Sequence, residues 1–161
     1  MKLKNYATLL FLILLSTTLS CSKDDESVEP CHATQITIKI NGELHTFTPA
    51  GRGIDIIWET GGYDLMLRFY GSIDRANENL GLDMIYKKTG YNVIDKLRLT
   101  LDDGEHVGVY NLVNDDFESD VIINRSECFY ATFSGKINDD GEELIITDGI
   151  ISYEYDEPFS E

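Results

Sequence analysis

Apolar and polar residues alternate with a period of two over most of this chain, and that pattern limits its possible folds more than any other feature. Ile36, Ile38 and Ile40 alternate with Thr37 and Lys39, and later runs repeat the spacing. Successive side chains of a β-strand point to opposite faces, so this period predicts strands with one buried face. No long stretch keeps the 3.6-residue spacing of a helix, and residues 75–79 are expected to form one helical turn at most.

Turn signals separate the alternating runs at intervals of about 8–12 residues. Asn41-Gly42 is typical of a type I′ hairpin turn, which needs positive φ at both central residues, and Asp148-Gly149 predicts a bend. We therefore predict an all-β fold, an antiparallel β-sandwich or barrel of about nine or ten strands, formed by a single domain over residues 35–161. We expect Trp58 in the core, because it follows Ile56 and Ile57.

Residues 1–20 have the layout of a secretory signal peptide. Lys2 and Lys4 give a positive start, residues 7–15 are apolar except for Thr8, and small and polar residues follow up to position 20. The apolar run has about half of the roughly 20 residues that a membrane-spanning helix needs. We therefore expect this segment to direct export and then to be removed.

Cys21 follows the expected cleavage point directly. The run Thr18-Leu19-Ser20-Cys21 resembles a bacterial lipobox, although Thr18 stands where that motif usually has leucine. The resemblance implies that Cys21 is lipidated and holds the chain at a membrane, because two or more acyl chains anchor a protein firmly. The alternative is an ordinary secreted protein in which Cys21 is an unmodified thiol.

The charge of the chain is strongly acidic, with 13 basic against 29 acidic residues and a net charge of −16. Residues 1–20 contain two of the basic residues and none of the acidic ones, so the remainder carries −18. Such a surface repels nucleic acid and anionic lipid, so neither is expected as a direct partner. Residues 21–34 are polar, and we interpret them as a flexible acidic tether.

Motifs with a known catalytic or metal-binding mechanism are missing from the sequence. His32, His45 and His106 are scattered, and no paired-histidine helix motif, phosphate loop or nucleophile elbow is present. We therefore expect no catalytic residues, no cofactor and no metal. The acidic clusters at 102–105, 114–116 and 138–142 are interpreted as turns rather than as calcium loops, because none has the spacing of an EF-hand.

Aromatic residues raise the possibility of a sugar-binding platform. An exposed aromatic face often marks a binding site, but tyrosine and tryptophan also pack well on the faces of strands. The candidates for such a platform are Trp58, Tyr63, Tyr70, Tyr91, Tyr110, Tyr130, Tyr153 and Tyr155.

A disulfide is predicted between Cys31 and Cys128. If Cys21 carries lipid, these are the two remaining cysteines, and the compartment beyond the inner membrane allows them to oxidise. The alternative is a pair of free thiols.

The segment Cys21–Glu26 resembles the start of lipoproteins of Bacteroidota, in which a lysine and acidic residues after the lipidated cysteine direct export to the cell surface. The body resembles small lipoprotein families of the same group. This resemblance implies a β-sandwich-like fold, an outer-membrane location facing outward, and no assigned activity. It is carried by Ile40–Gly42, Gly108–Leu112, Ala131–Gly135 and Ile146–Gly149.

From these features we expect a non-catalytic binding or structural module of the cell envelope. Its partner would be an extracellular protein or a carbohydrate. The second hypothesis is a small-ligand carrier, if the strands enclose a hollow barrel, and an enzyme is the third. A filled core favours the module and a ligand-sized apolar cavity favours the carrier.

Overall fold

The computed structural model describes residues 29–102, 104, 107–139 and 142–160, so Cys21 and His106 lie outside the described residues. The described part is all-β, as predicted, with ten strands and a single 3₁₀ turn, η1. In chain order these elements are β1 (Gln35–Ile40), β2 (Glu43–Ile57), β3 (Gly62–Gly71), η1 (Ile73–Arg75), β4 (Asn79–Ile85), β5 (Gly90–Tyr91), β6 (Lys96–Asp102), β7 (Val107–Asn111), β8 (Glu118–Asn124), β9 (Cys128–Asp139) and β10 (Glu142–Glu154).

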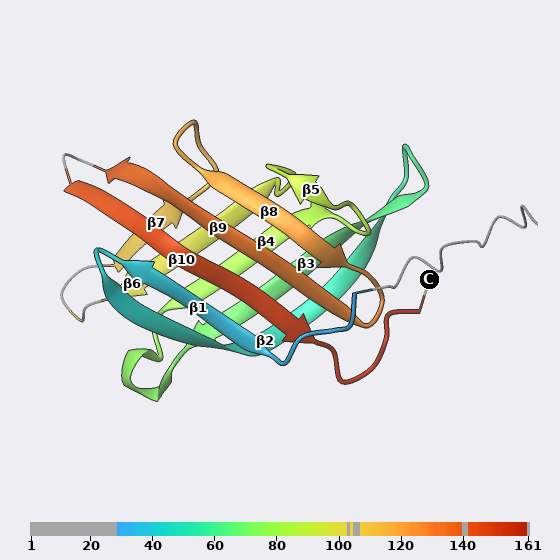
Figure 1. Cartoon of the computed structure of the whole chain (residues 1–161), viewed down its shortest axis with the longest axis horizontal. Coiled ribbons are helices and arrows are strands. Elements are labelled where there is room, and N and C mark those ends of the chain that lie inside the picture. Colours follow the sequence, from blue (N-terminus) through green and yellow to red (C-terminus); the bar gives the residue numbers. More distant parts are fainter. Residues whose placement is uncertain (1–28, 103, 105–106, 140–141, 161) are drawn as a thin grey trace, which may run out of the picture.

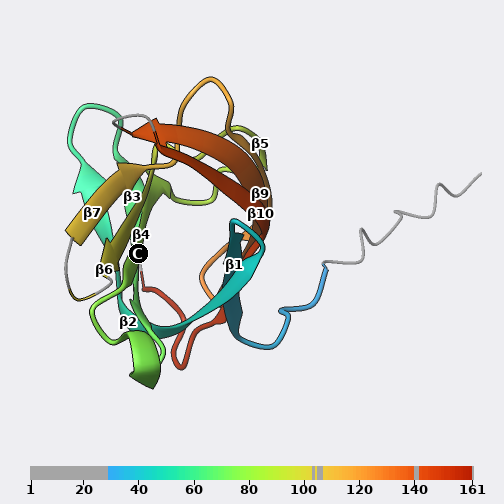
Figure 2. The ribbon, with the colours of Figure 1, turned by 90° about the vertical axis from the view of Figure 1, so that its left-hand side faces the viewer.

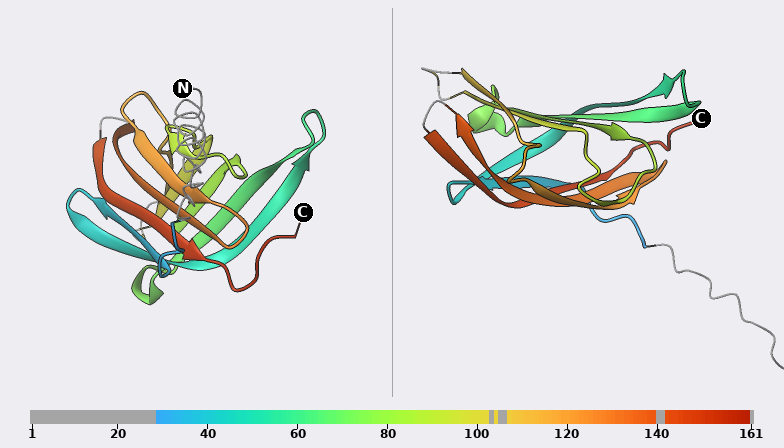
Figure 3. Two further views of the ribbon diagram at one scale, coloured as in Figure 1. Left: turned by 45° about the vertical axis from the view of Figure 1, so that its right-hand side comes forward. Right: turned by 90° about the horizontal axis from the view of Figure 1, so that it is seen from above.

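All ten strands belong to one antiparallel sheet with the order β5-β8-β9-β10-β1-β2-β3-β4-β6-β7. The sheet curls on itself, so β8, β9, β10 and β1 form one wall and β3, β4, β6 and β7 form the other (Figures 1 and 2). Seen from above, the two walls lie as two layers connected through β2 (Figure 3). Because the strand order is linear, β5 and β7 are the edges of an open half-barrel.

Two of the strands are long, and bulges bend them without ending them. β2 runs for 15 residues with a register shift between Pro49 and Gly51. β10 runs for 13 residues with a shift between Ile146 and Gly149, where Asp148 has a φ of 49°. Bulges increase local twist and bend, which allows each strand to continue around the curve of the sheet.

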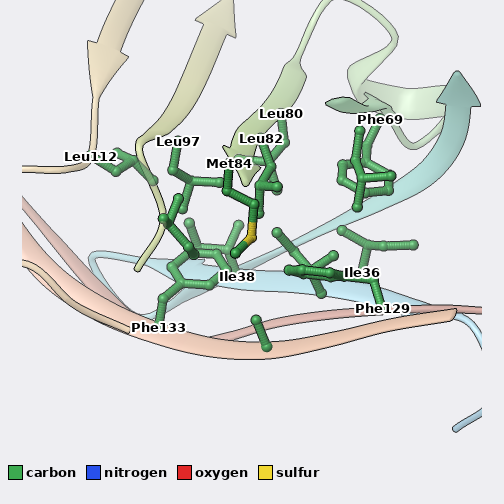
Figure 4. Close-up of a cluster of buried hydrophobic side chains, with 14 of the residues drawn as sticks. Ile36, Ile38, Phe69, Leu80, Leu82, Met84, Leu97, Leu112, Phe129 and Phe133 are labelled. Atoms are coloured by element: carbon green, nitrogen blue, oxygen red, sulfur yellow. The ribbon is translucent and has the colours of Figure 1, made fainter. Parts of the chain in front are cut away.

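The space between the two walls is filled by one apolar cluster. Leu67, Leu82 and Leu97 come from one wall and are 0% exposed, and they face Ile38 and Ala131 of the other wall, also 0% exposed. Figure 4 shows side chains of both walls pointing toward one another. The predicted alternation is therefore confirmed, and it places a packed core inside the curled sheet.

Trp58 is not part of this core, and the prediction that it would be is wrong. Its side chain is 84% exposed, at the turn between β2 and β3. β1 pairs with β2 as far as Phe47, and β4 pairs with β3 as far as Asp64. The β2–β3 hairpin extends past both neighbouring strands (Figure 1), so its tip has no sheet on either side to bury it.

A disulfide joins Cys31 to Cys128, as predicted, with a Cα–Cα distance of 5.9 Å. Cys31 precedes β1 and Cys128 begins β9. Two hydrogen bonds continue the attachment: the Ser152 hydroxyl donates to the Ala33 carbonyl at 2.8 Å, and the Glu154 amide donates to the Thr34 hydroxyl at 3.1 Å. The chain is therefore fixed to the sheet from Cys31 onward.

An aromatic cluster closes the end of the curled sheet where β10 finishes. The rings of Tyr155 and Phe159 are 4.9 Å apart, and Tyr86 meets Phe159 at 5.7 Å. The Arg52 guanidinium lies 4.6 Å from the Phe159 ring centroid and donates to the Glu157 carbonyl at 2.6 Å. These contacts hold the C-terminal tail against β2.

We expect replacement of both Cys31 and Cys128 by serine to lower the free energy of unfolding by about 2–5 kcal/mol, because the bridge closes a long loop. The sequence separation of the two cysteines is 97 residues. Urea unfolding of the double variant and of the wild type, with and without reductant, measures the difference. Wild type under reductant should match the variant, and equal midpoints for all samples would contradict the prediction.

A second prediction concerns Tyr155, whose ring is 6% exposed. Burial raises the pKa of its phenol well above the usual value, neighbouring Tyr86 adds to this rise, and the Arg52 charge opposes it. Above a pH of about 10, Tyr155 ionises in the unfolded chain but stays neutral in the folded one. Ionisation therefore favours the unfolded state, and the stability of wild type falls as pH rises. Tyr155→Phe should therefore lose less stability than wild type between pH 8 and 11.

Urea unfolding at these pH values tests the Tyr155 prediction. At pH 8 the variant should be as stable as wild type or more so, because the Tyr155 hydroxyl is buried without a hydrogen-bond partner among the described residues. Tyr91→Phe is the matched control, since that ring is 80% exposed. An alkaline loss in Tyr155→Phe as steep as that of wild type would count against the assignment.

Candidate functional site

The outer face of β3, β4 and β6 carries three cross-strand rows of side chains. The central row is Arg68, Gly81 and Arg98, which lie opposite one another in register. Leu67, Leu82 and Leu97, and the residues two positions away from them along each strand, point into the core. The alternating register therefore holds the polar residues of these strands together on the outside.

Gly81 has no side chain of its own between the two arginines, and the side chain of Arg68 lies beside it. A Cβ atom at Gly81 would have the Cδ, Nη1 and Nε of Arg68 as its nearest neighbours, at ordinary contact distances of 3.5, 3.6 and 3.7 Å. A groove of about 360 Å³ lies on this part of the face, and we call it the β4 groove. Its outward-facing lining consists of Arg68, Tyr70, Asn79, Gly81, Asp83, Lys96, Arg98 and Thr100.

Arg68 is fixed in place at the side of the β4 groove. Its Nη1 donates to the Leu67 carbonyl at 2.8 Å and to the Leu82 carbonyl at 3.0 Å. Its Nη2 lies 2.6 Å from Asp83 Oδ1. Asp83 is the one carboxylate of the lining, and this ion pair neutralises it, so the groove offers no free acid and base pair.

Arg98 is the opposite case, because within the described part of the chain no hydrogen bond or ion pair engages its guanidinium. Lys96 on the same strand is exposed as well. The β4 groove thus holds three cations and one carboxylate in a chain whose net charge is −16. The excess of cations makes the groove locally attractive to an anion, whereas the acidic remainder of the surface repels one.

A larger groove, of about 750 Å³, lies on the outer face of the other wall. It is lined by Glu118, Asp120 and Asp148, with Tyr91 at one side. Lys39 pairs with Asp148 at 2.8 Å. Its acidic character matches that of the chain as a whole, so a solvated surface accounts for it, and the β4 groove is the better candidate.

Two of the buried polar side chains, His45 and Glu78, belong to a closed structural network. His45 and Glu78 are 5% and 4% exposed, and His45 Nδ1 lies 2.9 Å from Glu78 Oε2. Arg75 Nη1 donates to Glu78 Oε1 at 3.2 Å, and its Nη2 donates to Glu43. Burial alone would lower the pKa of Arg75, but the hydrogen bonds and charges of Glu78 and Glu43 outweigh it and raise that pKa. The network ties the loop after β3 to the start of β2.

The aromatic residues singled out in the sequence are dispersed rather than assembled into one platform. Tyr153 and Tyr155 are buried, whereas Tyr70 and Tyr91 are exposed and line different grooves. Trp58 stands apart at the β2–β3 tip. One aromatic ring, that of Tyr70, therefore joins the candidate site.

Two of the acidic clusters form local turns, as interpreted from the sequence. Asp102 Oδ1 accepts the Gly104 amide at 2.8 Å, and Asn114 Oδ1 accepts the Asp116 amide at 3.0 Å. Residues 103 and 105 of the first cluster and 140 and 141 of the third lie outside the described residues. In the described ranges no group of three or more His, Cys, Asp or Glu side chains is placed to hold a metal ion.

Sequence reasoning missed Arg68, Gly81 and Arg98 as a group. Each lies on a different strand, and the cross-strand order that joins them passes over β5 to pair β4 with β6. The available signal was a basic or glycine residue between two large apolar residues in each of the three strands.

The described residues include no helix with the length and hydropathy of a bilayer-spanning segment.

The architecture is that of an all-β protein built on one curled antiparallel sheet. No family model, curated protein or solved structure matches the chain. Its function is therefore argued from the geometry.

Two glycines of neighbouring strands give a matched test of this geometry. Gly81→Ala should change the free energy of unfolding by no more than about 1 kcal/mol, and toward higher stability, because the new methyl group meets the Arg68 side chain at ordinary contact distances. Gly71→Ala should destabilise by about 1–3 kcal/mol, since its Cβ would fall 2.2 Å from the Arg75 carbonyl oxygen. Urea unfolding measures both variants, and equal effects at the two sites would contradict this difference in packing.

Proposed function

We propose that this chain is a lipid-anchored, non-catalytic binding module of the bacterial cell envelope, with the β4 groove as its ligand site. The observation that carries the binding role is the contrast between an interior filled by apolar side chains and a polar groove on the outer face. The core side chains of both walls form one cluster, whereas the β4 groove exposes charged and hydrogen-bonding groups.

The same observation favours the module over a small-ligand carrier. A carrier needs an apolar space of ligand size inside the sheet. Here Leu82 and Leu97 of one wall and Ile38 and Ala131 of the other are fully buried in the same apolar cluster. An enzyme is disfavoured at the β4 groove in particular, because Asp83 is already paired with Arg68. General acid–base chemistry needs a group that is free to exchange a proton with substrate.

The membrane anchor in this proposal rests on the lipobox-like run that ends at Cys21. Cys31 is fixed to the sheet by its disulfide. The ten residues from Cys21 to Cys31 span at most about 35 Å when fully extended. A lipid on Cys21 would therefore keep the domain near the bilayer surface, with enough freedom to turn the β4 groove toward a partner.

We further propose outer-membrane location with the domain facing outward. The support is the segment Lys23–Glu26, which would stand directly beside the lipid where a sorting factor can bind it. A negative domain on an acidic tether is also repelled by anionic headgroups, which suits a module that works in solution above the membrane.

Cell fractionation and protease shaving test the location. Wild type should sediment with the outer membrane and be cleaved on intact cells, while a periplasmic marker stays protected. Cys21→Ala should move to the soluble fraction, and alanine replacement of Lys23–Glu26 should leave the protein membrane-bound but protected. Membrane retention of Cys21→Ala refutes the anchor, and shaving of the tether variant refutes the sorting role.

Ligand mapping by NMR tests the binding role. A panel of monosaccharides, uronic acids, amino acids and long-chain fatty acids is titrated into labelled soluble domain. The proposal expects amide shifts at residues 79–81 and 96–100, which Gly81→Leu abolishes by filling the floor of the groove. Shifts centred on the core leucines with fatty acids would support the carrier instead and overturn this assignment.

A further inference from the structure

We infer that the β4 groove recognises a carboxylate-bearing sugar, with Arg98 as the anchor for the carboxylate and Tyr70 as the surface for the ring. This inference rests on the proposed binding function and adds the chemical class of the ligand. It follows from the charge of the groove, the state of its two arginines, and the neighbouring row of polar and aromatic side chains.

The charge of the groove selects an anion. Arg68, Lys96 and Arg98 line it together, and its one carboxylate is engaged by Arg68. Arg68 and Arg98 flank Gly81 on adjacent strands, so their Cα atoms lie roughly two strand spacings, about 10 Å, apart. Gly81 adds no side chain between them, so an anion held by Arg98 would face the Arg68 side chain that lies beside the glycine.

The two arginines differ in a way that assigns their roles. Arg68 already uses Nη1 on two carbonyls and Nη2 on Asp83, so it acts as a fixed positive wall. Arg98 is exposed and, among the described residues, unengaged. A free guanidinium pairs with a carboxylate through two parallel hydrogen bonds, so Arg98 is the group that binds the ligand's charge directly.

The row beside the arginines suits a sugar ring. Tyr70, Asn79 and Thr100 are opposite one another in register on β3, β4 and β6. Tyr70 is 58% exposed, and its ring offers a flat apolar face with a polar tip. Asn79 Nδ2 donates to the Asn77 carbonyl at 3.0 Å, which leaves its Oδ1 as an acceptor for a sugar hydroxyl beside the Thr100 hydroxyl.

The size of the groove and the charge of the whole chain limit the ligand to a short segment. A volume of about 360 Å³ lies near the lower end of the range of about 300–1,000 Å³ for ligand sites. A long polyanion would also meet the acidic remainder of the surface, which repels it. A single acidic sugar residue, terminal or within a largely neutral chain, satisfies both limits.

Isothermal titration of the folded domain tests this inference with three carboxylate sugars: digalacturonate, a glucuronate disaccharide and N-acetylneuraminate. At least one should bind, and its methyl ester, which keeps the ring and removes the charge, should bind at least about tenfold more weakly, as expected for loss of a charge-assisted hydrogen-bonded pair. Inorganic phosphate separates a sugar site from a bare anion site, and it should bind more weakly than the sugar acid.

Matched variants locate the effect. Arg98→Gln should weaken binding by about 10–100-fold, Arg98→Lys by less, and Tyr70→Ala by more than Tyr70→Phe. Lys136→Gln is the control, because it removes the same charge from β9 of the other wall, and it should leave affinity unchanged. Circular dichroism and urea unfolding confirm that each variant is folded.

Several outcomes overturn the inference, and they are distinguishable from failure of the proposed function. If neutral sugars bind as well as acids, and Gly81→Leu abolishes binding but Arg98→Gln does not, the groove is a ligand site of another class. If phosphate binds as tightly as the sugar acids, the site recognises an anion alone. If none of the three acids binds, or if binding survives Gly81→Leu, the assignment of acidic sugars to this groove is wrong.

Discussion

The packing of one sheet face against itself is the constraint on which the rest of this structure depends. Leu67, Leu82 and Leu97 are cross-strand neighbours in register, and all three are fully buried against the opposite wall. A slip of one residue would turn every one of these side chains to the solvent. The same register therefore fixes which residues face outward, and it places Arg68, Gly81 and Arg98 in one row.

Core and candidate site are thus two sides of the same strands. The core side holds the ladder in place through apolar burial, which is worth about 25 cal/mol per Å² of apolar surface. The outer side inherits this rigidity, because its side chains start from backbone positions that the core has already fixed. A site built on strands keeps its geometry better than one built on loops. The shape of the β4 groove is therefore maintained by the core, and it needs few contacts of its own.

The sequence was sufficient to predict the features that depend on local pattern. The all-β class, the Asn41-Gly42 turn with φ values of 51° and 85°, and the bend at Asp148 all follow from residues close in the chain. The pairing of Cys31 with Cys128 followed from setting aside Cys21 as the expected lipidation site, which left two cysteines. The bulges near Pro49 and Gly149 let β2 and β10 bend and continue.

Features that depend on distant parts of the chain were not accessible in this way. The apolar run Ile56-Ile57-Trp58 resembles a buried strand, but its burial depends on the length of β1 and β4, which end before they reach it. The groove likewise depends on β4 pairing with β6 rather than with β5. Cross-strand order is not encoded in any one segment, so neither Trp58 nor the Arg68–Arg98 row could be placed from local pattern.

Gly81 shows how folding and function meet at one residue. Glycine in a strand interior weakens the strand, because it loses more backbone freedom on folding and offers no side chain to pack. At Gly71 and Gly149 a packing reason is evident, since a Cβ atom would lie 2.2 Å from the Arg75 carbonyl oxygen and 2.6 Å from the Phe133 ring. No such neighbour requires glycine at Gly81, which has no positive φ and no contact closer than 3.5 Å. The neighbour of Gly81 is the Arg68 side chain, whose Nη1 donates to the Leu67 and Leu82 carbonyls. The missing side chain of Gly81 is therefore best explained by the room that it leaves for Arg68 along the floor of the β4 groove.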